Sequence, residues 1–234
     1  MELIIDIETV SNHKDFEEIS SPLKKQWERK ASFLRLSETE QLNPHQSYFN
    51  HAGIYAEFGK IICIGIGFVQ DKEKQIRIKM IANHNEKALI LEFFQLIIDI
   101  EKKIQKPIIL CGHNIKEFDL PYICRRALVH GIPLPKSLKL SGLKPWQILH
   151  QDTLELWRFG DYKHYTSLDL LAQILNIPSS KTDIDGSEVN NVYWNENDLQ
   201  RISDYCAKDI FTTALVYLRL SRENFKYYDP IYIS

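Results

Sequence analysis

Two carboxylates, Asp6 and Glu8, lie two positions apart in the apolar run of residues 3–10 (LIIDIETV). Such a run predicts a buried β-strand, and alternate residues of a strand share one face, so both acids point the same way. Buried carboxylates repel each other unless a positive group lies between them, and hard divalent cations such as Mg²⁺ and Mn²⁺ prefer oxygen ligands. The pair therefore indicates a metal site on the first strand. A strand with one solvated face explains the same two residues, and the pair alone does not decide between the interpretations.

A third acid, Asp119, ends the segment of residues 113–119 (HNIKEFD), which follows an apolar strand. It stands directly before a predicted helix with Pro121 in its first turn, so an ordinary helix N-cap explains it as well. Asn114 and Phe118 favour a ligand site, because an amide at a strand end and an aromatic ring beside the acid are suited to holding a ligand.

A fourth acid, Asp209, lies four residues after Tyr205 on a predicted long helix, so the two side chains share one helix face. They flank an apolar stripe that includes Ile202, Cys206 and Ile210. A solvated helix face with an incidental Tyr/Asp pair is the alternative. If the helix packs on the first strand, the hydroxyl and the carboxylate reach the metal site together.

The elements that must position these residues follow from the hydrophobic pattern. Three strands in antiparallel order and then alternating helices and strands predict an α/β sheet covered on both faces. We expect one domain over residues 1–234, with a polar helical and loop insertion near residues 11–57. Beyond the first strand, the expected strands are 60–69, 75–82, 107–112 and 148–152, and the expected helices are 86–104, 120–130, 167–175 and 196–220.

Composition limits the class of protein. The 234 residues are 44% hydrophobic with a formal charge of -2, so the chain has no global basic field and any polyanion must be held locally. The four cysteines lack paired metal-ligand spacing and are expected to be core thiols. The chain has no secretory leader and no apolar stretch near the roughly 20 residues of a membrane helix, so a cytoplasmic location without membrane contact is expected.

Three short motifs, taken together, resemble those of a known family. In chain order they resemble the exonuclease motifs of the DEDDy branch of the DnaQ-like 3′-to-5′ exonucleases, with a particular likeness to bacterial predicted exonucleases related to the proofreading domain of family-B DNA polymerases. The matching residues are Asp6-x-Glu8, Asn114-x-x-x-Phe118-Asp119 and Tyr205-x-x-x-Asp209. The likeness extends to residues 58–65 (FGKIICIG), 167–172 (SLDLLA) and 181–189, in which Lys181, Asp183 and Asp185-Gly186-Ser187 match.

The resemblance implies an RNase H-like fold, with a central mixed five-stranded sheet flanked by helices and the first strand in its middle. It implies that Tyr205 contacts the attacking water. It also implies that two divalent cations, Mg²⁺ or Mn²⁺, are bound by four acids, namely Asp6, Glu8, Asp119 and Asp209. The implied contacts to the substrate are Thr9, Asn114 and Phe118.

The expected function is that of a two-metal-ion 3′-to-5′ exonuclease that hydrolyses single-stranded DNA from its 3′ end and releases nucleoside 5′-monophosphates. A 3′-to-5′ exoribonuclease is the alternative enzyme, because no motif reports a contact to the 2′-hydroxyl. A non-catalytic nucleic-acid-binding domain of the same fold is the alternative from another class, and the presence of all four acids and the tyrosine argues against it. Replication or repair proteins are the expected partners in trans, since the chain carries no polymerase segment.

Aromatic residues near the motifs could stack on bases of a single strand. Core packing is the commoner role for any one of them, so none is assigned as a contact from this property alone. The residues concerned are Phe118, Trp157, Tyr162 and Tyr165.

Overall fold

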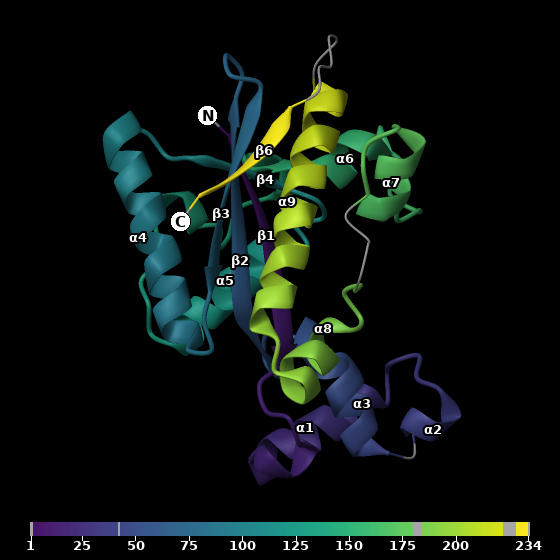
Figure 1. Cartoon of the computed structure of the whole chain (residues 1–234). Coiled ribbons are helices and arrows are strands. Elements are labelled where there is room, and N and C mark those ends of the chain that lie inside the picture. The colour runs from purple at the N-terminus through teal and green to yellow at the C-terminus, as the bar shows by residue number, and fades with distance from the viewer. Residues whose placement is uncertain (1, 42, 180–183, 222–227, 234) are drawn as a thin grey trace.

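The protein is built around a mixed sheet with helices on both faces (Figure 1). The computed structural model describes residues 2–41, 43–179, 184–221 and 228–233. Its strand order is β5-β4-β1-β2-β3-β6. β1 pairs antiparallel with β2 and parallel with β4, which places the first strand inside the sheet. The strands are β1 (Glu2–Ser11), β2 (Gly59–Gln70), β3 (Gln75–Ala82), β4 (Ile109–Gly112), β5 (Gln151–Asp152) and β6 (Asp229–Ile233).

The sheet has six described strands, one more than the five predicted from the sequence. All five predicted strands are present, and β6 adds to the edge by pairing parallel with β3. β6 is short and largely exposed, and it contains Pro230, a residue that strands tolerate at sheet edges. Its own sequence therefore carries little strand signal, because the pairing with β3 is what makes it a strand.

Helices cover the two faces of the sheet, with α4 (Glu86–Ile104) and α9 (Leu199–Ser221) on opposite sides (Figure 1). Four helices begin and end within a few residues of the ranges that the pattern predicts. They are α4, α9, α5 (Asp119–Val129) and α7 (Leu168–Ile174). The remaining helices are α1 (Ser21–Ala31), α2 (Glu38–Gln41), α3 (Pro44–His51), α6 (Thr153–Arg158) and α8 (Val189–Asn191).

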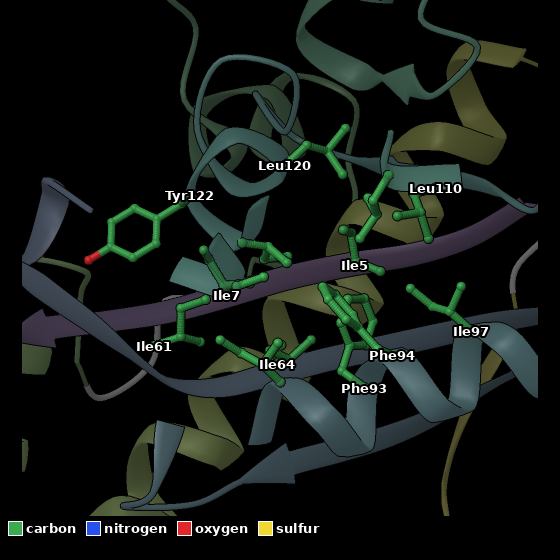
Figure 2. Close-up of a cluster of buried hydrophobic side chains, with 14 of the residues drawn as sticks. Ile5, Ile7, Ile61, Ile64, Phe93, Phe94, Ile97, Leu110, Leu120 and Tyr122 are labelled. Atoms are coloured by element: carbon green, nitrogen blue, oxygen red, sulfur yellow. The ribbon is translucent and has the colours of Figure 1, made fainter. Parts of the chain in front are cut away.

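Both faces of β1 are buried. Ile5 and Ile7 pack on one face, in the cluster with Phe93 and Phe94 of α4 that Figure 2 shows. Ile4 packs on the other face, in a cluster with α9. The side chains of even-numbered residues of β1 therefore point toward α9, where a polar group has little access to water.

The insertion of residues 11–57 holds α1, α2 and α3, which gather at one end of the molecule (Figure 1). Its small core surrounds the buried Trp27, whose indole Nε1 donates to Ser47 Oγ at 3.2 Å. Asn190 joins this segment to the end of β1, because its Nδ2 donates to the carbonyl of Phe49 at 2.7 Å and its Oδ1 accepts from the backbone N–H of Ser11 at 2.8 Å. The insertion thus borders the end of β1 that carries Glu8.

Two residues that contribute to the family resemblance, Lys181 and Asp183, lie outside the described residues. Among the helices that the structure describes, none has the length and apolar character needed to cross a membrane.

Candidate active site

β1 presents Asp6 and Glu8 on the face that α9 covers. The Cys206 thiol of α9 donates to Asp6 Oδ2 at 3.4 Å, and one ligand atom from each of Asp6, Glu8 and Cys206 lies within 4.8 Å of the other two. Glu8 is buried, as is Ile4 on the same face of the strand. The interpretation of this strand as having a solvated face is therefore wrong, because a helix lies over the acids.

Asp119 reaches the same strand from the start of α5. Its Oδ1 accepts a hydrogen bond from the backbone N–H of Ile7 at 3.1 Å, and the side chain is buried. The interpretation of Asp119 as an N-cap is wrong, because the cap position is occupied by Phe118 and Asp119 is the first residue of the helix. Its carboxylate is directed to the backbone between the two acids of β1.

α9 supplies Tyr205 and Asp209, one helical turn apart. Asp209 is buried, and its charge lies close enough to the Tyr205 hydroxyl to raise the pKa of that group. The contact of Cys206 with Asp6 fixes this part of α9 over β1. The helix therefore brings both residues to the acids of the first strand, although they are about 200 residues away in the chain.

The electrostatics of the cluster are those of crowded anions. Burial, followed by repulsion from Asp209 and Asp119, raises the pKa of Asp6 well above its ordinary value, and burial together with the charge of Asp6 does the same for Glu8. Burial raises the pKa of Asp119 to about 7. No lysine or arginine is among the causes that act on these three acids in the described part of the chain.

This environment fits divalent cations. Burial and the charges of neighbouring carboxylates both act on Asp6 and Glu8, and oxygen donors of this kind match Mg²⁺ or Mn²⁺. Burial raises the pKa of the Cys206 thiol well above its usual range, so this group is neutral and adds no charge to the cluster. The residues that could hold the cations are the four predicted acids, of which Asp6 and Glu8 have ligand atoms within 4.8 Å of each other.

A pocket of about 260 Å³ opens beside Glu8. Thr9 and Phe118 line it, and Thr9 follows a β-bulge at which the register between β1 and β2 shifts. The rest of the wall comes from β1, the insertion, the segment before α8 and α8 itself, with the lining residues Ile7, Asn50, Gly53, Ile54, Gly186, Ser187 and Asn190. The structure therefore places two of the three predicted substrate contacts at one concave site.

Asn114, the third predicted contact, is not among the lining residues of that pocket. It adopts a left-handed backbone conformation with φ +62°, and its backbone N–H donates to Asp152 Oδ1 at 2.9 Å. Asp152 also accepts from the backbone N–H groups of Lys116 and Leu154. Asn114 thus begins the turn that carries the chain from β4 to Asp119, and the buried Asp152 holds that turn.

The aromatic residues near the site divide into two groups. Trp157 packs against the apolar cluster beneath α9, and Phe118 packs against the cluster on the other face of the sheet, as expected for core residues. The expectation of core packing is wrong for Tyr162 and Tyr165, which are exposed. They belong to the segment between α6 and α7, where few neighbours are available to cover them.

The sequence reasoning missed several residues at the site. Cys206 is a buried thiol, as expected, but it also contacts Asp6, which its position directly after Tyr205 on a helix could have indicated. Asn50, Gly53 and Asn190 line the pocket, and no short motif marks them. They reach the pocket only because the insertion and the start of α8 meet at the end of β1.

The mixed sheet, with its first strand inside and helices on both faces, has RNase H-like architecture. The structure of the family B DNA polymerase from the hyperthermophilic archaeon Pyrobaculum calidifontis matches this fold over 94% of the present chain and 25% of its own, with a TM-score of 0.50 and 16% sequence identity. The protein belongs to the family described as predicted 3′-5′ exonucleases related to the exonuclease domain of PolB, whose model matches residues 54–227.

A curated relative supports the same relationship. The DNA polymerase of Archaeoglobus fulgidus is 26% identical over 147 residues, which are 59% of this chain and 18% of that polymerase. The chain therefore spans about a fifth to a quarter of the length of these two polymerases.

Proposed function

We propose that this protein is a 3′-to-5′ exonuclease that shortens single-stranded DNA with the help of two divalent cations, Mg²⁺ or Mn²⁺. The observation that carries the proposal is the convergence of carboxylates from β1, the start of α5 and α9 on one buried site, with the Tyr205 hydroxyl beside them. The family relationship supports the direction of the reaction.

Four acids of the cluster are the proposed cation ligands: Asp6, Glu8, Asp119 and Asp209. The repulsion that Asp209 and Asp119 exert on Asp6, and Asp6 on Glu8, favours a bound cation at this site. Two divalent cations, when bound, activate a water molecule and neutralise the leaving oxygen of an in-line displacement at phosphorus.

In the proposed reaction, the oxygen of water forms a bond to the terminal phosphorus as the water gives up a proton to solvent, and the bond from phosphorus to the 3′ oxygen breaks. The 3′ oxygen takes a proton from solvent, and a nucleoside 5′-monophosphate is released. Burial and the nearby acids raise the pKa of the Tyr205 hydroxyl, so it keeps its proton at neutral pH. We therefore assign Tyr205 to orienting the water and not to removing its proton.

The terminal nucleotide is proposed to occupy the pocket between Thr9, Phe118 and the insertion. Single-stranded DNA is the favoured substrate because the relative matched in sequence and the protein matched in structure are both DNA polymerases. A 3′-to-5′ exoribonuclease remains the alternative enzyme, and a domain that binds nucleic acid without cutting it is the alternative outside enzymes.

The test uses the protein with 5′-labelled single-stranded DNA and RNA of equal sequence, in Mg²⁺, in Mn²⁺ and in chelator. The proposal expects a ladder of DNA shortened from its 3′ end in either metal and none in chelator, with nucleoside 5′-monophosphates identified by chromatography. Shortening of RNA alone establishes the exoribonuclease, and binding without shortening in any metal establishes the non-catalytic domain.

Substitutions link this activity to the cluster. Asp6→Asn and Asp209→Asn are expected to abolish shortening because each removes a charged ligand. Asp99→Asn is the matched control, since Asp99 is an exposed acid on α4, on the opposite face of the sheet. Full activity in either cluster variant would refute the assigned site.

A further inference from the structure

The segment between α6 and α7 carries three exposed aromatic side chains within seven residues. Phe159, Tyr162 and Tyr165 are 90%, 74% and 63% exposed. A single exposed aromatic residue needs no explanation, but a group of them on one short segment marks a surface that contacts something else. We call residues 159–165 the aromatic segment.

The aromatic segment is anchored to the loop that leads into the candidate site. His113, at the end of β4, donates from Nε2 to the carbonyl of Thr166 at 2.9 Å, and its Nδ1 lies 2.9 Å from Thr153 Oγ1. Its ring also contacts the ring of Tyr165, with centroids 6.3 Å apart. The segment is thereby anchored at His113, the residue that precedes Asn114 and the turn to Asp119.

Tyr165 lies close enough to the cluster to experience its charge. Burial of part of the side chain, followed by the charges of Asp152 and Asp119, raises the pKa of its hydroxyl. The ring itself remains mostly open to solvent. Through its ring contact with His113, Tyr165 lies beside the turn that leads from β4 to Asp119.

A positive charge supports the other end of the segment. The guanidinium carbon of Arg158 lies 5.8 Å from the centroid of the Tyr162 ring, and the Arg158 side chain is 10% exposed. Within the described part of the chain its Nε has no hydrogen-bond partner, and its Nη1 donates to Glu117 Oε1 at 3.4 Å. Arg158 therefore places a positive charge next to an exposed ring, and its contact with Glu117 neutralises that charge only weakly.

The nucleotide pocket and the aromatic segment are built from different parts of the chain. The pocket is lined by the insertion, the segment before α8 and Phe118, and it includes no residue of the aromatic segment. At about 260 Å³ it is too small for more than a single nucleotide. A strand whose last nucleotide fills the pocket must therefore leave the site over another surface.

Resting on the proposed function, we infer that the aromatic segment is the surface over which the substrate strand leaves, with Tyr162 and Tyr165 stacking on bases that precede the terminal nucleotide. Aromatic rings stack on every base, and a nearby cation offsets the backbone phosphates, so this surface suits a single strand of any sequence. Longer strands should then bind more tightly than dinucleotides, which fill only the pocket and its neighbourhood.

The test measures binding and not cleavage. Fluorescence anisotropy with 5′-labelled oligothymidylates of two and eight nucleotides is recorded in Ca²⁺, and electrophoresis verifies that the DNA stays intact. The proteins are the parent, Tyr162→Ala, Tyr165→Ala and the double variant. Tyr232→Ala is the matched control, because Tyr232 is 61% exposed and lies on β6, three strands away from β1.

Each single variant is expected to weaken binding of the octamer at least about fivefold, which is the lower end of the range for one stacked base. The double variant should weaken it further, whereas the dinucleotide should bind all of these proteins as it binds the parent. Tyr165→Phe is expected to retain the parent affinity because the ring does the stacking. The Tyr232→Ala control should equal the parent with both oligonucleotides.

Equal octamer affinities for Tyr162→Ala, Tyr165→Ala and Tyr232→Ala would overturn the inference. An equal loss for the octamer and the dinucleotide would overturn it too, since the two tyrosines would then act at the pocket itself. The proposed activity fails separately, if the parent protein does not shorten DNA in Mg²⁺ or Mn²⁺, because the binding comparison is read without cleavage.

Discussion

The carboxylate of Asp119 accepts the backbone N–H of Ile7 at 3.1 Å, directly between Asp6 and Glu8 on the first strand. The parallel pairing of β1 with β4 extends only from Glu2 to Ile4, so the amide of Ile7 lies beyond that ladder. One hydrogen bond therefore sets the position of an acid from α5 relative to two acids of β1, and it also satisfies a buried backbone donor.

Substitutions of Asp119 should separate its structural role from its charge. At pH 4 the raised pKa keeps Asp119 protonated in the folded parent, and Asp119→Asn retains an oxygen acceptor for Ile7, so its free energy of unfolding should stay near that of the parent. Its activity at neutral pH should be lost. Asp119→Ala leaves the buried N–H without a partner and should lower the free energy of unfolding by about 1 to 3 kcal/mol. Urea denaturation in chelator measures both values. Equal stability of the two variants would show that the hydrogen bond to Ile7 contributes nothing.

Tyr205→Phe should slow hydrolysis by about 10- to 100-fold, because a group that positions a reactant contributes on this scale. The affinity for Mn²⁺ should change little, since the acids remain in place. Single-turnover cleavage measures the rate and isothermal titration calorimetry measures the metal affinity. Cleavage at the parent rate would remove the assigned role of Tyr205, and a large loss of Mn²⁺ affinity would place the residue in cation binding instead.

The crowded acids should make the metal-free protein less stable as the pH rises. Burial raises the pKa of Asp119 from 3.8 to about 7, so between these values the folded chain holds a proton that the unfolded chain has lost. The free energy of unfolding then falls with rising pH through this window, and the raised pKa values of Asp6 and Glu8 act in the same direction.

Added Mn²⁺ should reverse this loss, with a stabilisation that grows as the pH rises and the acids release their protons. Urea denaturation at pH values from 4 to 8, with chelator and with Mn²⁺, measures the effect. Asp119→Asn serves as the control and should show a smaller dependence on pH in chelator. If the free energy of unfolding of the metal-free protein rose between pH 4 and 7, the raised pKa values could not be the main cause of its pH dependence.

Gly65 of β2 should be intolerant of a side chain. A Cβ at this position would lie 2.6 Å from Ile210 Cγ1 and 3.0 Å from Cys206 Sγ, so Gly65→Ala must push α9 away from the sheet. The expected cost is about 1 to 3 kcal/mol in the free energy of unfolding, and activity should fall because Asp209 moves with the helix. Gly186→Ala is the control for stability, since a Cβ there meets no atom within 4 Å. Equal urea denaturation midpoints for both variants would contradict this close packing.

The local sequence determined most of the framework. The runs that form β1, β2 and β3 and the apolar spacing of α4 and α9 each carry a strong signal, because burial on a sheet or helix face imposes a period on neighbouring residues. β6 had no such signal, since its short exposed sequence becomes a strand by pairing with β3. The acids were identified through their resemblance to three ordered motifs, because residue types and spacing can be read directly from the sequence.

Only the tertiary structure decided what these residues face. Asp6 could lie on a solvated strand face until α9 was placed over it, and Asp119 could cap its own helix until its carboxylate was found on the N–H of Ile7. The pocket wall from the insertion and the exposure of Tyr162 and Tyr165 likewise depend on segments distant in the chain. The physical reason is that burial, convergence of charges and exposure are properties of pairs of elements, which no single stretch of sequence specifies.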